Sequence, residues 1–227
     1  NSGTSAYQLL SWCEGVNLDK VLSTFPVAEQ FALGKKAGGI LMMIHGIPVP
    51  FDFEDWSVRY SDQNDLRIKA FLSCGIQIDG SDHIVKFIED NKNLLRNRPQ
   101  CFNHGDFHTG NLMITNNGNL SVIDWEILDF ENVADPWYEF NRIGNSELCS
   151  YFTTGLIRGY FDGEPPNEFW RLLAFYLASG SLMLVSWAYY IRQDMLDYSI
   201  QQVRNVLKWY DSMQCVIPDW YISNYYS

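Results

Sequence analysis

Three polar residues in the middle of the chain have the types and the spacing of a phosphoryl-transfer site. Asp106 precedes Asn111 by five residues, and Asp124 directly follows the second of two short β-type runs. We predict strands at 112–115 and 120–123, because the Asn-Asn-Gly-Asn sequence between them favours a hairpin turn. A hairpin returns the chain to its starting point, so the three side chains are expected to converge.

The chemistry expected of this group is magnesium-assisted transfer of a phosphoryl group. Carboxylate and amide oxygens are the hard ligands that Mg²⁺ takes, while phosphates and water complete its shell. We predict that Asn111 and Asp124 hold the metal and that Asp106 accepts the proton of the attacking hydroxyl. The order matches the H-x-D-x-x-x-x-N loop of kinases followed by a strand-borne Asp, with His104 in the first position.

The remaining residues of this region are expected to support the site. His104 and His108 are predicted to fix the loop through hydrogen bonds, and Trp125 is predicted to pack beneath the metal site. Taken singly, Asp106 would be interpreted as an ordinary turn residue. Its place within the pattern favours the catalytic role.

The chain resembles the aminoglycoside phosphotransferase and choline kinase family, which is protein-kinase-like. The family signature H-G-D-x-H-x-G-N corresponds to residues 104–111, I-D-W-E corresponds to 123–126, and the later D-P corresponds to Asp135-Pro136. Phe107 and Thr109 replace the Leu and Pro that are common in the family. Glu139 stands where Asp is usual, so its role is left open.

The resemblance implies an α+β, mainly α fold: the C-terminal lobe of a protein-kinase-like phosphotransferase, with a small β-hairpin carrying the metal site. Residues 1–15 would form the inter-lobe hinge and residues 16–227 the catalytic and substrate-binding lobe. Backbone groups of Ser11, Trp12 and Cys13 would receive the adenine of ATP, or the base of GTP. The sequence contains no G-x-G-x-x-G loop and no strand-borne Lys of the V-A-I-K type, so we expect an N-terminal lobe outside this chain.

The implied activity is transfer of the γ-phosphate to a hydroxyl of a small cationic molecule. An aminoglycoside, and so antibiotic resistance, is the first expectation, and choline or another amino alcohol the second. The carboxylates suggested for such a substrate, with a solvated face as the alternative interpretation, are Glu126, Asp129, Glu131 and Glu139. A non-catalytic kinase-like binding module is the rival hypothesis. The missing lobe favours it, whereas the intact triplet of site residues argues against it.

Composition restricts the partners and the compartment. The formal net charge of −11 disfavours binding to nucleic acid or anionic lipid. The five cysteines are scattered without a CxxC spacing, which argues against a disulfide scaffold or a zinc site and favours a cytoplasmic protein. No signal peptide is visible at the start of the sequence.

One uncharged run, residues 172–190, is long enough to cross a bilayer. We interpret it instead as a helix buried inside a helical domain, and no membrane partner is expected. A membrane-associated helical protein is the alternative.

The apolar spacing predicts a mostly helical chain around the hairpin, after a short strand-like run at 6–11. Gly34, Gly38 and Gly39 weaken the first helix unless another backbone packs closely there. Ser81 is expected to cap the third helix. The predicted helices span 27–45, 63–73, 82–97, 136–143, 147–161, 167–191 and 194–213.

Overall fold

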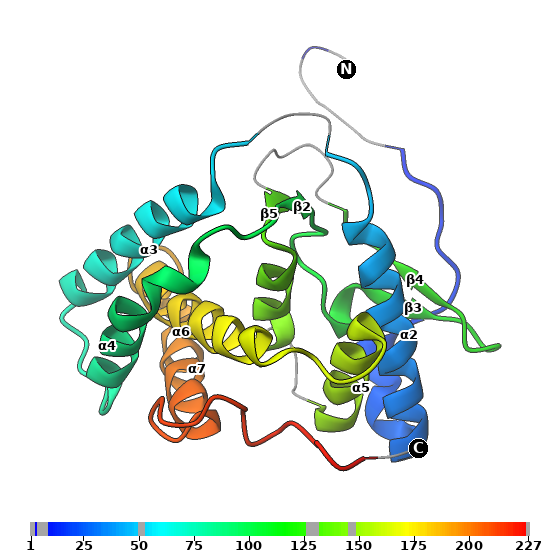
Figure 1. Ribbon diagram of the computed structural model, residues 1–227. Helices are drawn as coiled ribbons and strands as arrows, with labels where there is room; N and C mark the ends of the chain where they lie inside the picture. The colour runs from blue at the N-terminus through cyan, green and yellow to red at the C-terminus, as the bar shows by residue number, and fades with distance from the viewer. Residues whose placement is uncertain (1–2, 4–8, 50–52, 126–131, 145–148, 226–227) are drawn as a thin grey trace.

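A computed structural model describes residues 3, 9–49, 53–125, 132–144 and 149–225. The chain is mainly helical, with two small sheets near its middle (Figure 1). The helices of this part are α1 (Leu18–Val21), α2 (Val27–His45), α3 (Trp56–Ser73), α4 (Ser81–Asn91), α5 (Ser150–Phe161), α6 (Asn167–Tyr190) and α7 (Leu196–Trp209). The strands are β1 (Val16–Asn17), β2 (Cys101–Phe102), β3 (Leu112–Ile114), β4 (Leu120–Val122) and β5 (Val133–Ala134).

The predicted hairpin is present. Strand β3 pairs antiparallel with β4, so that Leu112 faces Val122 and Ile114 faces Leu120. The other edge of β3 pairs with β1, which gives a three-stranded sheet in the order β1-β3-β4. A second sheet joins β2 to β5. Leu112 and Ile114 are buried, so the hairpin is anchored to the core by one face of β3.

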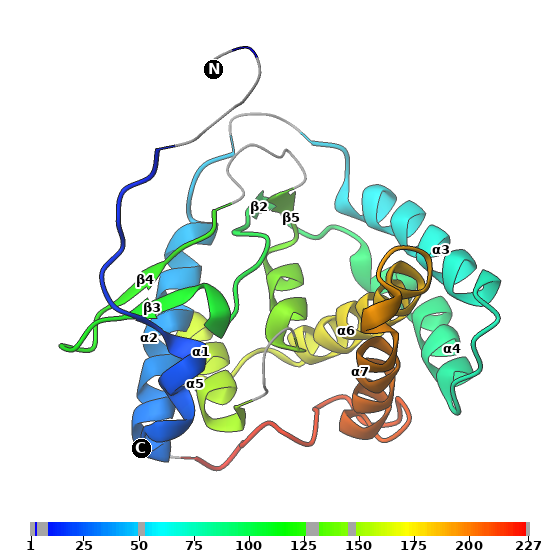
Figure 2. The same cartoon turned by 180° about the vertical axis from the view of Figure 1, so that it is seen from behind.

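Helices α2 and α5 lie side by side in both views (Figures 1 and 2). Their contact is backbone to backbone, because a Cβ on Gly34 would lie 2.1 Å from the Phe152 carbonyl oxygen and one on Gly38 would lie 2.1 Å from that of Leu156. The close approach of another backbone that was expected for these glycines is therefore present at Gly34 and Gly38. It is absent at Gly39, where a Cβ would contact nothing.

Helix α6 forms the centre of the other half of the molecule, where it packs against α3, α4 and α7. Its length and apolar composition satisfy the criteria for a membrane span, and within the described chain it is the single helix that does so. However, 72% of its apolar window is buried in the protein. The tyrosine Tyr176 is fully buried on α6 and accepts a hydrogen bond from Trp56 Nε1 at 2.9 Å. These features identify α6 as a core helix.

Several predicted helix boundaries are wrong. Helix α3 begins at Trp56, seven residues before the predicted start, because the Asp55 carboxylate caps it by accepting from Ser57 N at 2.8 Å. Helix α4 ends at Asn91 and continues as a short 3₁₀ turn, and its N-cap is Gly80 (φ 80°) in place of Ser81.

Two further segments differ from the expectation in type. Residues Pro136–Gly144 form a 3₁₀ segment where an α-helix was predicted. Of the strand-like run at 6–11, the described residues 9–11 form no strand.

Candidate active site

The hairpin brings the two halves of the sequence motif together at its open end. A 3₁₀ turn at Thr109–Asn111 leads directly into β3, and Ile123 N donates to the Asn111 carbonyl at 3.0 Å. Ile123 therefore pairs with Asn111, and Asp124 is the residue directly after Ile123. Asp124 is exposed and has a left-handed backbone (φ 62°), which turns the chain as it leaves the sheet.

Asp106 is surrounded by donors. Its Oδ2 accepts hydrogen bonds from His108 Nε2 at 3.3 Å and from Asn111 Nδ2 at 3.1 Å. Arg142 Nε lies 3.7 Å from its Oδ1. The side chain keeps 31% of its surface exposed, so an incoming hydroxyl can reach it. These contacts fix the carboxylate without burying it, as a positioned proton acceptor requires.

The two histidines of the motif hold the loop in shape. His104 is fully buried, and its Nε2 donates to the Ile123 carbonyl at 3.0 Å while Nδ1 accepts from Asp106 N at 3.3 Å. In His108, Nδ1 accepts from Gly110 N at 3.1 Å, which leaves Nε2–H for Asp106. Both patterns specify a neutral ring with the proton on Nε2.

Glu139 acts on this loop from outside the motif. Its Oε2 accepts from Gly105 N at 2.9 Å and its Oε1 from Phe107 N at 3.0 Å, so one carboxylate holds the amides on both sides of Asp106. Glu139 is 3% exposed, and burial raises its pKa above the usual range although the two amide donors oppose this. A carboxylate committed to backbone in this way has little left for a substrate, which was the role suggested for it.

Gly105 needs to be glycine. Its φ of 90° is left-handed, and a Cβ there would lie 2.8 Å from Asn132 Oδ1. Arg142 Nε donates to the Gly105 carbonyl at 2.8 Å, so this residue is held on both its amide and its carbonyl.

The donor set fits Mg²⁺. Because Asn111 Nδ2 donates to both the backbone carbonyl and the carboxylate of Asp106, Oδ1 of the same amide is its remaining ligand atom. Asp124 adds an exposed carboxylate. Among the described residues no group of three or more His, Cys, Asp and Glu side chains could hold a metal. Two protein oxygens fit an ion that takes the rest of its shell from phosphates and water.

Strand β1 and helix α1 reach this site by contacts that the motif did not reveal. Thr109 Oγ1 donates to Asp19 Oδ1 at 2.7 Å, and the Asn17 side chain donates to the Gly110 carbonyl. Further back, Ser11 and Trp12 are exposed and Cys13 is half-buried, in a segment without regular structure. Their role in binding the nucleotide base stays a prediction.

The structure describes the predicted site residue Trp125 but not the acidic residues that follow it. Trp125 meets His104 edge to face, with ring centroids 4.9 Å apart, and donates from Nε1 to the Val122 carbonyl at 3.0 Å. It is 36% exposed, so it lies against the loop more openly than predicted. Glu126, Asp129 and Glu131 lie outside the described residues.

The D-P element has a structural partner that the sequence did not suggest. Asp135 is fully buried and forms a bidentate ion pair with Arg98, at 2.6 Å to Nε and 3.1 Å to Nη2. Tyr176 of α6 donates to the same carboxylate at 2.7 Å. Asp135 therefore joins the strand β5 to the core helix.

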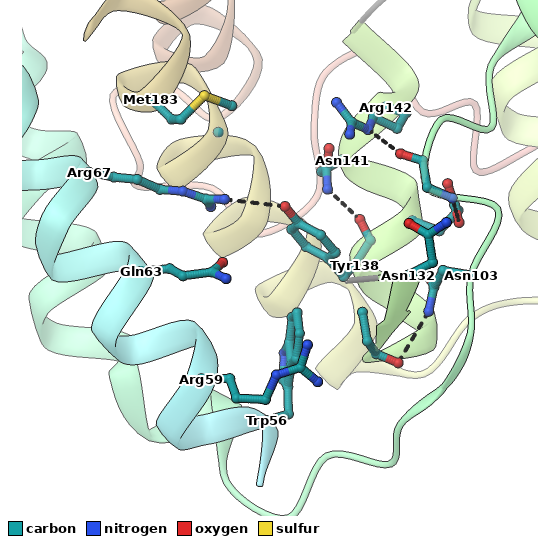
Figure 3. A pocket seen from close by; sticks show the side chains of 14 residues that line it. Trp56, Arg59, Gln63, Arg67, Asn103, Asn132, Tyr138, Asn141, Arg142 and Met183 are labelled. Atoms are coloured by element: carbon teal, nitrogen blue, oxygen red, sulfur yellow. Dashed lines mark hydrogen bonds between the residues drawn. The ribbon is translucent and has the colours of Figure 1, made fainter. Parts of the chain in front are cut away.

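A cavity of about 320 Å³ opens beside the catalytic loop (Figure 3). Gly105, Glu139 and Arg142 form its wall on the loop side. Helix α3 forms the opposite wall, with Trp56, Arg59, Gln63 and Arg67. Its volume is at the small end of the range for ligand pockets.

Comparison with known proteins gives a family and a fold. A family described as "Phosphotransferase enzyme family" matches residues 2–174. No curated protein matches the chain. Among solved structures, a choline/ethanolamine kinase family protein from Mesorhizobium loti superposes with a TM-score of 0.60 at 17% identity, over 87% of this chain and 67% of that one.

Two aminoglycoside-related structures are similar to the same degree. The gentamicin-APH(2")-IIa complex has a TM-score of 0.60 at 17% identity, covering 85% of this chain and 68% of that one. ADP-bound aminoglycoside phosphotransferase APH(2'')-Ib has a TM-score of 0.59 at 18% identity, covering 86% and 70%. At these identities the likeness shows a shared kinase-like fold, whereas the family match extends over most of the chain. The chain belongs to the phosphotransferase enzyme family.

Proposed function

We propose that this chain is the catalytic C-terminal lobe of a kinase that transfers the γ-phosphate of ATP or GTP to a hydroxyl of a small molecule. Residues 1–15 would serve as the hinge and 16–227 as the lobe. The observation that carries the proposal is the Asp106 carboxylate, which is held by His108 and Asn111 at 3.3 Å and 3.1 Å next to the start of the hairpin that leads to Asp124.

In this proposal Asp106 accepts the proton as the acceptor oxygen attacks the γ-phosphorus. Asn111 Oδ1 and the Asp124 carboxylate would hold Mg²⁺, which when bound neutralises charge on the phosphates. Glu139 and Arg142 keep the loop in place through the backbone of Gly105. The nucleotide clamp of an N-terminal lobe would complete the site, so residues 1–227 alone are expected to turn over poorly.

A cationic acceptor, an aminoglycoside first and a choline-like amino alcohol second, is one candidate substrate class. It is supported by the names of the structural neighbours and by the acidic residues Glu126, Asp129 and Glu131. If these residues bind a polycation, Asp129→Lys or Glu131→Lys raises KM for gentamicin more than it lowers kcat. Unchanged KM in both variants would assign the run to a solvated surface.

The central experiment measures acceptor-dependent ADP and GDP release by the full-length protein with Mg²⁺. We expect release that requires a hydroxyl compound and that is lost in Asp106→Asn. Absence of nucleotide binding would favour the non-catalytic binding module, which keeps the lobe but has lost the use of nucleotide. Binding of Mg·ATP without transfer to acceptors of any charge class would contradict the proposed transfer.

A further inference from the structure

The cavity beside the catalytic loop has a charge opposite to that of the chain as a whole. Three arginines line it, Arg59, Arg67 and Arg142, and Glu139 is its one carboxylate among the described residues. The chain carries a formal net charge of −11. Concentrating guanidinium groups around one cavity of an acidic protein opposes the general field and favours an anionic ligand.

Helix α3 supplies two of these arginines along one stripe. Arg59, Gln63 and Arg67 are spaced four residues apart, which places them on one face of the helix, and Figure 3 shows this face turned to the cavity. Gln63 is exposed between the two cations. The wall therefore presents a row of hydrogen-bond donors at a fixed distance from the catalytic loop.

The partners of Arg59 and Arg67 are neutral. Arg59 Nη1 donates to Gln100 Oε1 at 2.8 Å and to the Val133 carbonyl at 2.9 Å. Arg67 donates to the hydroxyls of Tyr60 at 2.9 Å, Ser179 at 3.3 Å and Tyr138 at 3.4 Å. In the part of the chain that the structure describes, neither guanidinium forms an ion pair with a carboxylate.

Arg59 and Arg142 keep donors that they do not use. A guanidinium has five N–H groups. Within the described residues, Arg59 donates from Nη1 alone, and Arg142 donates from Nε to Gly105 but forms no hydrogen bond from Nη1 or Nη2. The planar pair of nitrogens that remains matches the two oxygens of a carboxylate or phosphate.

The carboxylate in the cavity lining, Glu139, already binds the catalytic loop. Its Oε2 accepts a hydrogen bond from Gly105 N and its Oε1 accepts one from Phe107 N. A cationic group entering this cavity would meet three guanidiniums and a single carboxylate on the described walls, Glu139, which is held by the loop amides. The same walls include Asn103, which is 2% exposed and whose Oδ1 has no hydrogen-bond partner among the described residues.

We propose that the cavity binds the acceptor substrate and that the acceptor is an anionic hydroxyl compound, a small molecule with a carboxylate or phosphate group. Arg59 binds its anionic group through the unused Nε and Nη2, and Arg67 adds positive charge two helical turns along the same wall. Arg142 adjoins the reacting end, since its Nε lies 3.7 Å from Asp106 Oδ1. This inference rests on the proposed kinase function and specifies its substrate class.

The proposed reaction is the transfer of one phosphoryl group from the nucleotide to the acceptor hydroxyl. The acceptor hydroxyl oxygen forms a bond to the γ-phosphorus, the bond from that phosphorus to the β–γ bridging oxygen breaks, and the nucleoside diphosphate leaves. The hydroxyl proton passes to the Asp106 carboxylate. The arginines of α3 take no part in these bond changes, so they should affect acceptor binding more than turnover.

The test uses the full-length protein with Mg·ATP and five acceptors that differ in charge: glycerate, glycerol 3-phosphate, glycerol, ethanolamine and gentamicin. ADP release is measured by a coupled assay, and binding of glycerate and glycerol 3-phosphate by calorimetry. We expect the two anionic compounds to bind and to be phosphorylated with the highest kcat/KM. Arg59→Gln and Arg67→Gln should each raise their KM on the order of tenfold or more, with KM for ATP unchanged.

Two matched variants keep the test valid if loss of an arginine unfolds the protein. Gln63→Glu and Gln63→Lys alter the charge of the same wall at an exposed position. The first should raise and the second lower KM for the anionic acceptors, with the reverse for ethanolamine. Arg204→Gln, at an exposed position of α7, removes a positive charge that is not part of the cavity lining and should change neither.

The possible results separate this inference from the proposed function. ADP release with gentamicin or ethanolamine but not with the anions, together with no detectable binding of either anion, overturns the anionic acceptor and leaves the kinase. An increase in KM for ATP in Arg59→Gln and Arg67→Gln, with acceptor KM unchanged, assigns the arginines to the nucleotide phosphates and also overturns it. Absence of nucleotide binding overturns the kinase itself.

Discussion

The catalytic loop and the α2–α5 pair are fixed in place by different forces. In the loop, Asp106 is held by hydrogen bonds from His108 and Asn111, and the backbone around it is held by Glu139. The α2–α5 pair is joined at its seam by direct backbone packing, which Gly38 allows, with a hydrogen bond between His45 Nδ1 and the Tyr160 hydroxyl at 2.8 Å. Changes in the loop should therefore alter turnover with little effect on stability, and changes in the seam should do the reverse.

The substitution with the largest expected effect is Asp106→Asn, which should lower the rate of turnover. The amide keeps the shape of the side chain but removes the proton acceptor, so kcat should fall on the order of 10²–10⁴-fold. Binding of Mg·ATP and the melting temperature should stay near those of the parent.

Asp124→Asn provides the contrast within the same site. Losing a carboxylate ligand should weaken Mg²⁺ affinity, seen as a raised Mg²⁺ requirement in titrations of ATP binding and of turnover. Near-normal kcat in Asp106→Asn, or Mg·ATP binding as tight as the parent's in Asp124→Asn, would show that the two roles have been assigned wrongly.

The next effect is on stability, in Gly38→Ala. The new Cβ would lie 2.1 Å from the Leu156 carbonyl oxygen, so the helices must separate, at a cost of about 3 kcal/mol in the free energy of unfolding. Urea denaturation of the full-length protein measures this cost, and kcat of the folded fraction should be preserved.

Gly39→Ala is the matched control, one residue further along the same helix. A Cβ there contacts nothing, so replacing glycine should stabilise the helix by about 0.5–1 kcal/mol. Equal effects of the two substitutions would mean that the backbone contact does not determine the stability of this seam.

The same contrast explains how much of the molecule could be predicted from the sequence. The hairpin, helix α2 and the loop motif are local features, written in turn residues, apolar spacing and a fixed order of polar residues. The start of α3 combines a local signal, the Asp55 cap, with a distant contact, since Trp56 donates to Tyr176 of α6. The cap is written near residue 56, whereas the contact with α6 is not.

The roles of single residues show the same limit. Glu139 had been grouped with nearby acidic residues, because the distance along the sequence from Gly105 concealed its bonds to the loop. Arg59 lies outside the predicted helix at 63–73, so the sequence did not place it with Gln63 and Arg67 on one helical face, and it could not show which part of the molecule that face turns to. Both features depend on how the helices pack.

A smaller effect on turnover than that of Asp106→Asn is expected from Glu139→Gln, which tests the boundary between the two regions. The side chain keeps its size, but one of its oxygens becomes an NH₂ group that opposes a backbone N–H of Gly105 or Phe107. We expect kcat to fall about tenfold and the free energy of unfolding to fall by about 1–2 kcal/mol, the cost of leaving a buried amide unsatisfied.

Glu54→Gln, which removes an exposed carboxylate, should change neither quantity. If Glu139→Gln lowers stability while kcat of the folded protein is unchanged, Glu139 belongs with the packing scaffold. If KM for the acceptor rises while kcat and stability are unchanged, Glu139 contacts the substrate, as the sequence alone suggested.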